Sequence, residues 1–199
     1  IIIDEKTAVF DTVSENFIDE WLENIRAEIG EKKIDYLIVQ HMEPDHSSGI
    51  ARFMLENPET TIVATAKAFT MMRQFFGDEY TERRIITAEG MELVLGKHTL
   101  KFFMAPMVHW PEVMVTYDSE AKTVFSADAF GKFGALDTQD EEWDCEARRY
   151  YVGIVGKYGV QVQAVLKKFK TLDVQTICPL HGPVLKENLA HYLNLYEIW

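Results

Sequence analysis

The chain has 199 residues, a length that suits one domain and at most two. Hydrophobic residues make up 47% and charged residues 26% of it, proportions typical of a globular domain rather than a disordered or fibrous protein. Its 32 acidic and 20 basic residues give a formal net charge of −12. Nucleic acids and anionic membranes attract basic surfaces, so this charge argues against both as partners.

Targeting and redox signals are weak. No apolar run approaches the roughly 18 residues of a membrane helix, and the first residues lack the basic segment of a signal peptide. The two cysteines, Cys145 and Cys178, form neither a CxxC pair nor a zinc-ribbon spacing, so no disulfide framework is expected. We therefore expect a cytoplasmic protein. The chain opens within a strand and without an initiator Met, so we expect its natural N-terminus to lie upstream.

The first part of the chain alternates strands with helices. Residues 1–3 and 8–10 flank a charged turn and predict a hairpin. Ser14 is the expected N-cap of an amphipathic helix that Gly30 ends. The elements expected next are a strand at 36–40, a short helix to about 57, a strand at 61–64 and a helix at 65–76.

Strands dominate the middle of the chain, where alternating patterns predict them at 84–87, 92–95, 99–104, 113–117 and 123–126. A loop at 131–139 precedes two expected helices, at 141–155 and 160–169. A strand at 176–178 and a terminal helix from about 188 complete the chain. Helices alternate with strands at both ends and a meander lies between them, which predicts an α/β fold with a mixed sheet.

Metal-ligating residue types follow several of the predicted strands directly. Loops at strand ends are where α/β proteins place functional residues. Four such side chains fall within six residues, and they can converge only if this segment forms an irregular turn. The candidate ligands, in chain order, are His41, Glu43, Asp45, His46, His109, Asp128 and His181.

A single member of this set would be explained more simply as a helix cap or a hydrogen-bonded residue. Four clustered ligand types and three more at later strand ends favour a metal site instead. Imidazoles and carboxylates without a thiolate suit iron, manganese or zinc, and a carboxylate has two oxygens with which it can bridge two ions. The remaining histidines, His98 in a hairpin turn and His191 on the terminal helix, have no acidic or clustered neighbour in sequence, so we expect both at the surface.

The order of the ligand residues resembles the metallo-β-lactamase superfamily, whose hydrolases typically show His-x-His-x-Asp-His and bind zinc. Glu43 stands where those enzymes have the second histidine. This substitution is similar to flavodiiron proteins, and the stretches at 109–111, 125–131, 150–151 and 179–183 resemble the same family. The resemblance covers nearly the whole chain. It implies that residues 1–199 form a metallo-β-lactamase-like diiron domain, an αββα sandwich with mixed β-sheets.

The resemblance also implies a ligand set for two non-haem iron ions, in which Asp128 bridges them. The first iron would take His41, Glu43 and His109, and the second Asp45, His46 and His181. Family members differ in whether the histidine equivalent to His46 binds metal. Three carboxylates neutralise three of the four charges of two divalent ions, so a bridging hydroxide or water is expected. Tyr150 or Tyr151 could hydrogen-bond a bound gas, although both also fit as helix packing residues.

The activity implied by the resemblance is reduction of O2 to water, of NO to N2O, or both. In the family, FMN on a flavodoxin-like domain of a neighbouring subunit supplies electrons in a head-to-tail homodimer or tetramer, and rubredoxin or a similar donor reduces the flavin. The chain holds no flavin phosphate loop, so alone it should not bind FMN tightly. We expect the family's first strands to lie outside this chain, and its flavodoxin-like domain to be fused beyond Trp199 or to be a separate polypeptide.

Two other functions fit the same residues. A dizinc hydrolase of the glyoxalase II or lactamase type would share the scaffold, with Glu43 replacing one histidine. The purified metal discriminates the two, although zinc displaces ferrous iron readily during overexpression. A non-catalytic O2 or NO sensor would keep the diiron site and show no turnover with a competent flavin donor.

Overall fold

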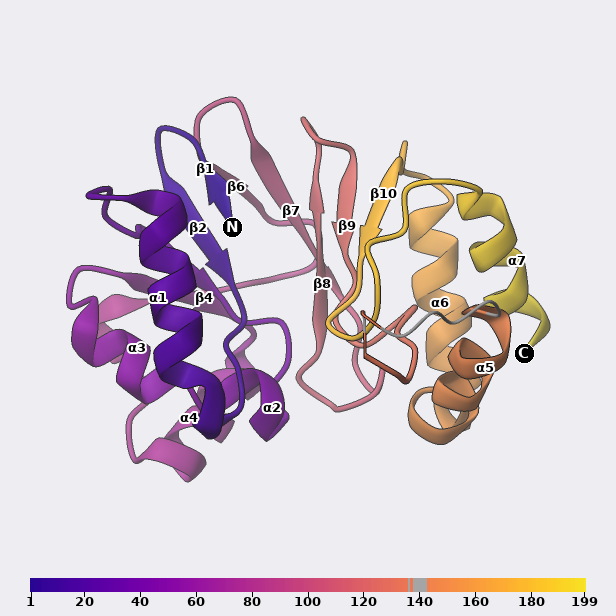
Figure 1. The fold of residues 1–199 in the computed structure, drawn as a ribbon, viewed down its shortest axis with the longest axis horizontal. Coiled ribbons are helices and arrows are strands. Elements are labelled where there is room, and N and C mark those ends of the chain that lie inside the picture. Colours follow the sequence, from indigo (N-terminus) through magenta and orange to yellow (C-terminus); the bar gives the residue numbers. More distant parts are fainter. Residues whose placement is uncertain (136, 138–142) are drawn as a thin grey trace.

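The computed structural model describes residues 1–135, 137 and 143–199. Two five-stranded sheets face each other at the centre of the molecule, and helices cover the outer face of each sheet (Figure 1). Both sheets are mixed, because each combines parallel with antiparallel neighbours. The αββα sandwich expected from the sequence is confirmed.

The first sheet is built almost entirely of parallel strands. β2 to β5 run parallel, and only β1 pairs antiparallel, as the expected hairpin partner of β2. Helices α1, α3 and α4 lie on the outer side of this sheet (Figure 1). The strands, in order across the sheet, are β1 (Ile2–Ile3), β2 (Thr7–Phe10), β3 (Tyr36–Ile38), β4 (Thr61–Ala64) and β5 (Arg84–Ile86). The helices are α1 (Ile18–Ile29), α3 (Ile50–Glu56) and α4 (Ala66–Phe76).

The second sheet is an antiparallel meander with one parallel strand added at its edge. β10 pairs parallel with β9, and the other neighbours pair antiparallel. Helices α5, α6 and α7 cover the outer side (Figure 1). In order across the sheet the strands are β10 (Thr176–Cys178), β9 (Thr123–Phe125), β8 (Met114–Asp118), β7 (Thr99–Met104) and β6 (Glu92–Val94). The helices are α5 (Trp143–Ile154), α6 (Gly159–Phe169) and α7 (Leu189–Ile198).

Strand periodicity distributes the apolar side chains into three core layers. Successive residues of a strand point to opposite faces of its sheet. On β3, Leu37 therefore packs with the helices α1, α3 and α4, while Ile38 packs between the two sheets. On β8, Met114 lies between the sheets and Val115 faces the helices of the other half. Four layers thus bury three apolar interfaces, which explains the continuous apolar runs of the central strands.

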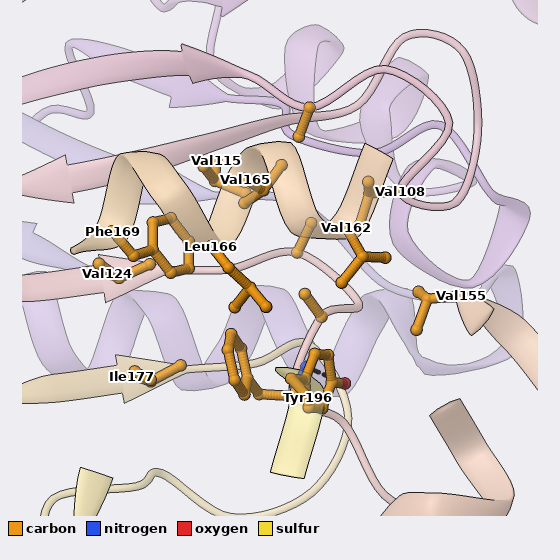
Figure 2. Packing of buried hydrophobic residues seen from close by; sticks show 14 of the residues in the cluster. Val108, Val115, Val124, Val155, Val162, Val165, Leu166, Phe169, Ile177 and Tyr196 are labelled. Carbon is orange, nitrogen blue, oxygen red and sulfur yellow. Dashed lines mark hydrogen bonds between the residues drawn. The ribbon is translucent and has the colours of Figure 1, made fainter. Parts of the chain in front are cut away.

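The outer layer of the second half is packed around α6 and α7. Figure 2 shows Val162, Val165, Leu166 and Phe169 of α6 over the strand residues of the second sheet, with Tyr196 of α7 beside them. Tyr196 is fully buried, and its hydroxyl accepts a hydrogen bond from the backbone N–H of Phe130. The terminal helix is therefore tied to the turn that follows β9.

Several element ends differ from the expectations. The strand expected at 36–40 ends at Ile38, because the carboxylate of Asp11 takes the backbone N–H groups of Gln40 and His41. Ser14 makes no side-chain cap, since the chain first turns through a 3₁₀ segment at Glu15–Phe17. Thr65 does cap α4, by accepting from the N–H of Ala68.

Part of one expected segment lies outside the described residues. The loop expected at 131–139 includes undescribed residues 136, 138 and 139, and the helix expected at 141–155 is described from Trp143 onward. A 3₁₀ turn at Gly156–Tyr158 separates it from α6. Among the described helices, none combines the length and the hydropathy that crossing a bilayer requires.

Candidate metal centre

The candidate ligands gather at one edge of the sandwich. They lie on the segments that follow the carboxyl ends of β3, β7, β9 and β10. The segment after β3 is not wholly irregular, because Pro44 begins a single helical turn, α2 (Pro44–Ser47), and this turn carries Asp45 and His46. Thr12 holds it in place, since both its N–H and its hydroxyl donate to the carbonyl of His46 at 2.8 Å.

A first ligand group combines residues from three of these segments. Nε2 of His109 lies 2.9 Å from Oε2 of Glu43 and 2.9 Å from Oδ2 of Asp128. Nε2 of His41 lies 3.3 Å from Nε2 of His109 and 3.3 Å from Oε2 of Glu43. One atom of each of these four residues therefore faces a common point.

A second group lies on the other side of Asp128. Nε2 of His46 and Nε2 of His181 are 2.9 Å apart, and they lie 3.4 and 3.3 Å from Oδ2 of Asp45. The second oxygen of Asp128, Oδ1, is 3.4 Å from Nε2 of His46. His46 is buried and directed into this group, as the sequence-based ligand set requires.

The spacing of these atoms matches that of ligands around a metal ion. Nitrogen and oxygen ligands lie about 2.1 Å from zinc or a similar ion, so neighbouring ligand atoms are about 3.0 to 3.4 Å apart in octahedral or tetrahedral geometry. The distances within the two groups run from 2.9 to 3.5 Å. Asp128 presents one oxygen to each group, which is the placement of a bridging carboxylate.

The electrostatics of the site also fit cations. Burial lowers the pKa of His41, but hydrogen bonds to Asp128, Glu112 and Glu43 outweigh it and raise that pKa to about 11. Burial opposes ionisation of Asp128, yet the surrounding imidazoles hold its pKa far below the usual range. Oδ1 of Asp45 and Oδ1 of Asp128 are buried and have no hydrogen-bond partner among the described residues. Unpaired buried oxygens next to facing imidazole nitrogens are what two bound metal ions would satisfy.

The turn that carries Asp128 is tightly constrained. Ala127 and Phe130 have φ values of 51° and 68°, in a backbone region that residues other than glycine rarely adopt. Such strained residues persist where the surroundings over-determine them. Here the ring of Phe130 stacks on Tyr196 with the centroids 4.2 Å apart, and a Cβ on Gly131 would lie 2.9 Å from the ring of Tyr150. The core of the second half therefore fixes the position of the shared carboxylate.

A cavity of about 340 Å³ opens onto both ligand groups. The cavity is far larger than a diatomic molecule, and its lining is partly polar. Its lining residues are Glu43, Asp45, Asp128, Lys132, Phe133, Gly134, Tyr150, Ile154, His181 and Gly182. Each ligand group reaches the outside through partly exposed members, Glu43 in the first group and Asp45 and His181 in the second, while His41 is fully buried.

The two candidate tyrosines are placed differently. Tyr150 lines the cavity, and its ring centroid lies 5.8 Å from that of His181. Burial, and after it the negative charge of Asp128, raises the pKa of Tyr150 well above its usual value, so its hydroxyl stays protonated. Tyr151 is not among the cavity residues described. Its ring packs against Tyr196 and Trp199 in the core.

The expectations for the two remaining histidines were wrong in part. His98 is half-buried, and its Nδ1 lies 2.6 Å from Oδ2 of Asp118, a residue 20 positions away in the sequence. His191 is at the surface, but its Nε2 lies 2.9 Å from Oδ1 of Asp144 on α5. Both acidic partners come from other elements, so sequence proximity could not reveal them.

Three residues near the ligands were not singled out from the sequence. Asp11 follows β2 and binds the backbone of the segment that carries His41. Glu112 bonds the outer ring nitrogen of His41, and Lys132 lines the cavity. One feature of the sequence could have indicated Asp11 and Glu112. Each is a carboxylate next to the end of a strand, at the same edge of the sandwich as the candidate ligands.

Comparison with known proteins assigns the family. A family model described as "ODP family beta lactamase" matches residues 1–182. The chain belongs to this family. A nitric oxide reductase of Moorella thermoacetica is 30% identical to it over 210 residues, which cover 100% of this chain and 52% of that protein.

Solved structures agree. The flavodiiron protein of Giardia intestinalis superposes with a TM-score of 0.93 at 29% identity, covering 100% of this chain and 50% of that one. Rubredoxin oxygen:oxidoreductase of Desulfovibrio gigas gives a TM-score of 0.90 at 29% identity, covering 98% and 51%. These similarities confirm the resemblance predicted from the ligand motif. The chain spans about a third to a half of the length of the curated relatives that it matches.

Proposed function

We propose that this chain is the diiron core of a reductase that converts O2 to water, NO to N2O, or both, with electrons from FMN. The single observation that carries the proposal is the pair of ligand groups that share Asp128 and open onto one cavity. The names of the Moorella, Giardia and Desulfovibrio relatives support the same chemistry.

The proposed ligand roles follow the two groups. His41, Glu43 and His109 would hold the first ion, Asp45, His46 and His181 the second, and Asp128 would bridge them. Hard carboxylate and imidazole ligands suit iron that cycles between ferrous and ferric states. When bound, a ferrous pair would supply two electrons to the gas. The chain's own contribution is to orient the ligands, shape the cavity and provide a protonated donor beside it.

Glu43 distinguishes this site from that of a zinc hydrolase. Its Oε2 contacts the Nε2 atoms of His41 and His109, where the hydrolase motif has an imidazole. We predict that Glu43→His raises zinc retention and lowers iron-dependent reduction of O2 or NO by about tenfold or more, because a neutral imidazole replaces a hard anionic carboxylate.

The check on Glu43→His is metal analysis and gas consumption on the same samples. Glu43→Gln, which keeps an oxygen at this position but removes the charge, is the matched comparison. Unchanged metal preference and unchanged reduction in Glu43→His would mean that the carboxylate is incidental.

Tyr150 is the protonated hydroxyl at the cavity, and we propose that it donates a hydrogen bond to the bound gas. Tyr150→Phe should lower turnover about tenfold or more while metal content stays unchanged, since a hydrogen bond to a developing negative charge is worth about 1.5 to 3 kcal/mol. Steady-state gas consumption with a fixed electron donor measures this.

Tyr151→Phe is the matched control, because Tyr151 directly follows Tyr150 on α5 but packs in the core. It should keep near-normal turnover. Equal losses in the two variants would point to helix packing rather than to a donor at the cavity.

The electron supply and assembly are also part of the proposal. We infer that FMN resides on a flavodoxin-like domain, in the same polypeptide or in another, and that rubredoxin or a similar protein reduces it. A head-to-tail homodimer or tetramer would bring that domain to the cavity of a neighbouring subunit. A cytoplasmic location fits the two free cysteines, Cys145 and Cys178.

The deciding experiment compares iron-loaded and zinc-loaded protein. With a reduced FMN-bearing flavodoxin as donor, the iron form should consume O2 or NO over many turnovers and the zinc form should not. Both forms should fail to hydrolyse a β-lactam or a glutathione thioester. Hydrolysis by the zinc form, with no reduction by the iron form, would establish the hydrolase alternative instead. A gas that binds to the iron form without any turnover would indicate a sensor.

A further inference from the structure

A buried glutamate holds His41 from the side opposite the cavity. Nδ1 of His41 lies 2.9 Å from Oε1 of Glu112, and both side chains are fully buried. The backbone N–H of Met42 donates to the same oxygen at 2.8 Å. Oε1 of Glu112 is thus an acceptor, so the ring donates from Nδ1, and its Nε2 faces the first ligand group, where it would offer a lone pair to a bound metal ion.

Glu112 also connects the two halves of the sandwich. It lies on the segment between β7 and β8, close after His109, whereas His41 follows β3 of the other sheet. Its backbone carbonyl accepts a hydrogen bond from the Thr65 hydroxyl at 2.9 Å, and Thr65 caps α4. One residue therefore links the segments that carry two ligands of the first group to the start of a helix.

This arrangement distinguishes His41 from the other histidines of the site. Among the hydrogen bonds of the described residues, no carboxylate contacts the Nδ1 of His46, His109 or His181. The first group therefore has one histidine with a built-in orienting partner, and the second group has none of this kind.

We propose that Glu112 is a positioning residue of the first ligand group, whose acceptor oxygen fixes His41 as its Nδ1–H tautomer and directs Nε2 at the ion. The inference rests on the dinuclear metal centre proposed above and not on its substrate. The opposite tautomer would present an N–H to the metal instead of a lone pair. Loss of such an outer partner typically lowers metal affinity about 10- to 100-fold.

Three variants separate this role from simple packing. Glu112→Leu fills the same space but offers no acceptor. Glu112→Gln keeps an acceptor oxygen, and its amide nitrogen would take the place of Oε2, which has no hydrogen-bond partner among the described residues. The matched control is Asp118→Ala, which removes another buried carboxylate paired with the Nδ1 of a histidine, at the far end of β8.

The measurement is titration of the metal-free protein with Zn(II) alone against a competing chelator. Each variant is also made in a His181→Ala background, where the first group is left, and in a His109→Ala background, where the second is left. Glu112→Leu should lower the Zn(II) affinity of the first group about 10- to 100-fold and leave the affinity of the second group unchanged. Glu112→Gln and Asp118→Ala should both behave like the unmodified chain.

The ¹⁵N NMR signals of the histidine rings give a readout that does not depend on activity. In the zinc-loaded chain, His41 should show a protonated Nδ1 and a metal-bound Nε2, and Glu112→Gln should preserve this pattern. This part of the test holds even if Glu112→Leu does not fold. A metal-bound Nδ1 in the unmodified chain would overturn the proposal.

The measured Zn(II) affinities can also contradict the positioning role of Glu112. Normal affinity in Glu112→Leu, an equal loss in Glu112→Gln, or equal losses in both ligand groups would each overturn the positioning role. An unmodified chain that binds one ion would contradict the dinuclear centre, while the effect of Glu112→Leu on that ion would still be measurable. The two failures are therefore distinguishable.

Discussion

Replacing Asp128 with alanine should remove both metal ions of the proposed centre and abolish the proposed reductase activity. Asp128 is almost fully buried, with Oδ2 2.9 Å from Nε2 of His109 and Oδ1 3.4 Å from Nε2 of His46. Its loss deprives both ligand groups of an anionic ligand at once. We expect metal affinity to fall at least about 100-fold at both positions, as measured by elemental analysis after dialysis.

Two comparisons make the Asp128→Ala result specific. His181→Ala should weaken only binding of the second ion, because His181 belongs to the second group and approaches Asp128 only at Oδ1, the oxygen directed at that group. Asp118→Ala removes a carboxylate that is equally buried but lies at the end of β8 remote from the ligand groups, and this variant should retain both ions. Two tightly bound ions in a folded Asp128→Ala protein would exclude Asp128 as their bridge.

The iron-loaded chain, once chemically reduced and given NO or O2 without a flavin partner, should react about once and then stop. A ferrous pair holds two electrons, which suffice for coupling two NO to N2O with two protons, but O2 reduction to two waters needs four electrons and four protons. The 199 residues contain no flavin phosphate loop, no CxxC pair and no thiolate pattern for an iron–sulfur cluster. We therefore expect about one N2O per chain.

Sustained turnover should return when an FMN-bearing flavodoxin-like domain is added together with NADH and a flavin reductase. The domain should dock where the cavity opens, near Asp45 and His181, since both are partly exposed there. The control omits only the flavodoxin-like domain. Many turnovers in that control would reveal another electron path and would contradict an obligatory flavin partner.

The gathering of the candidate ligands at one edge could be predicted from the sequence because each of them follows a strand closely. The carboxyl ends of β3, β7, β9 and β10 lie at one edge, so ligands that are far apart in sequence, such as His46 and His181, meet with their Nε2 atoms 2.9 Å apart. Strand and helix periodicity predicted an α/β fold with a mixed sheet, whereas the two outer helical layers were expected only from the family resemblance. In the structure, Leu37 and Ile38 face different cores.

The residues that hold the ligands could not be predicted in the same way. Glu112 and Asp11 act on His41 across 71 and 30 positions of sequence, and periodicity carries no information about such pairs. The same reason explains the errors. Asp11 ends β3 early by binding the backbone beyond it, and Asp118 pairs with His98 from a neighbouring strand.

The most direct test of the dinuclear centre is the iron content of the chain after anaerobic loading, combined with its EPR spectrum in the oxidised state. Two ferric ions bridged by Asp128 and a shared oxygen ligand would be magnetically coupled, so we predict two irons per chain and no signal from isolated ferric iron. One iron per chain, or two irons that each give an uncoupled ferric signal, would contradict it.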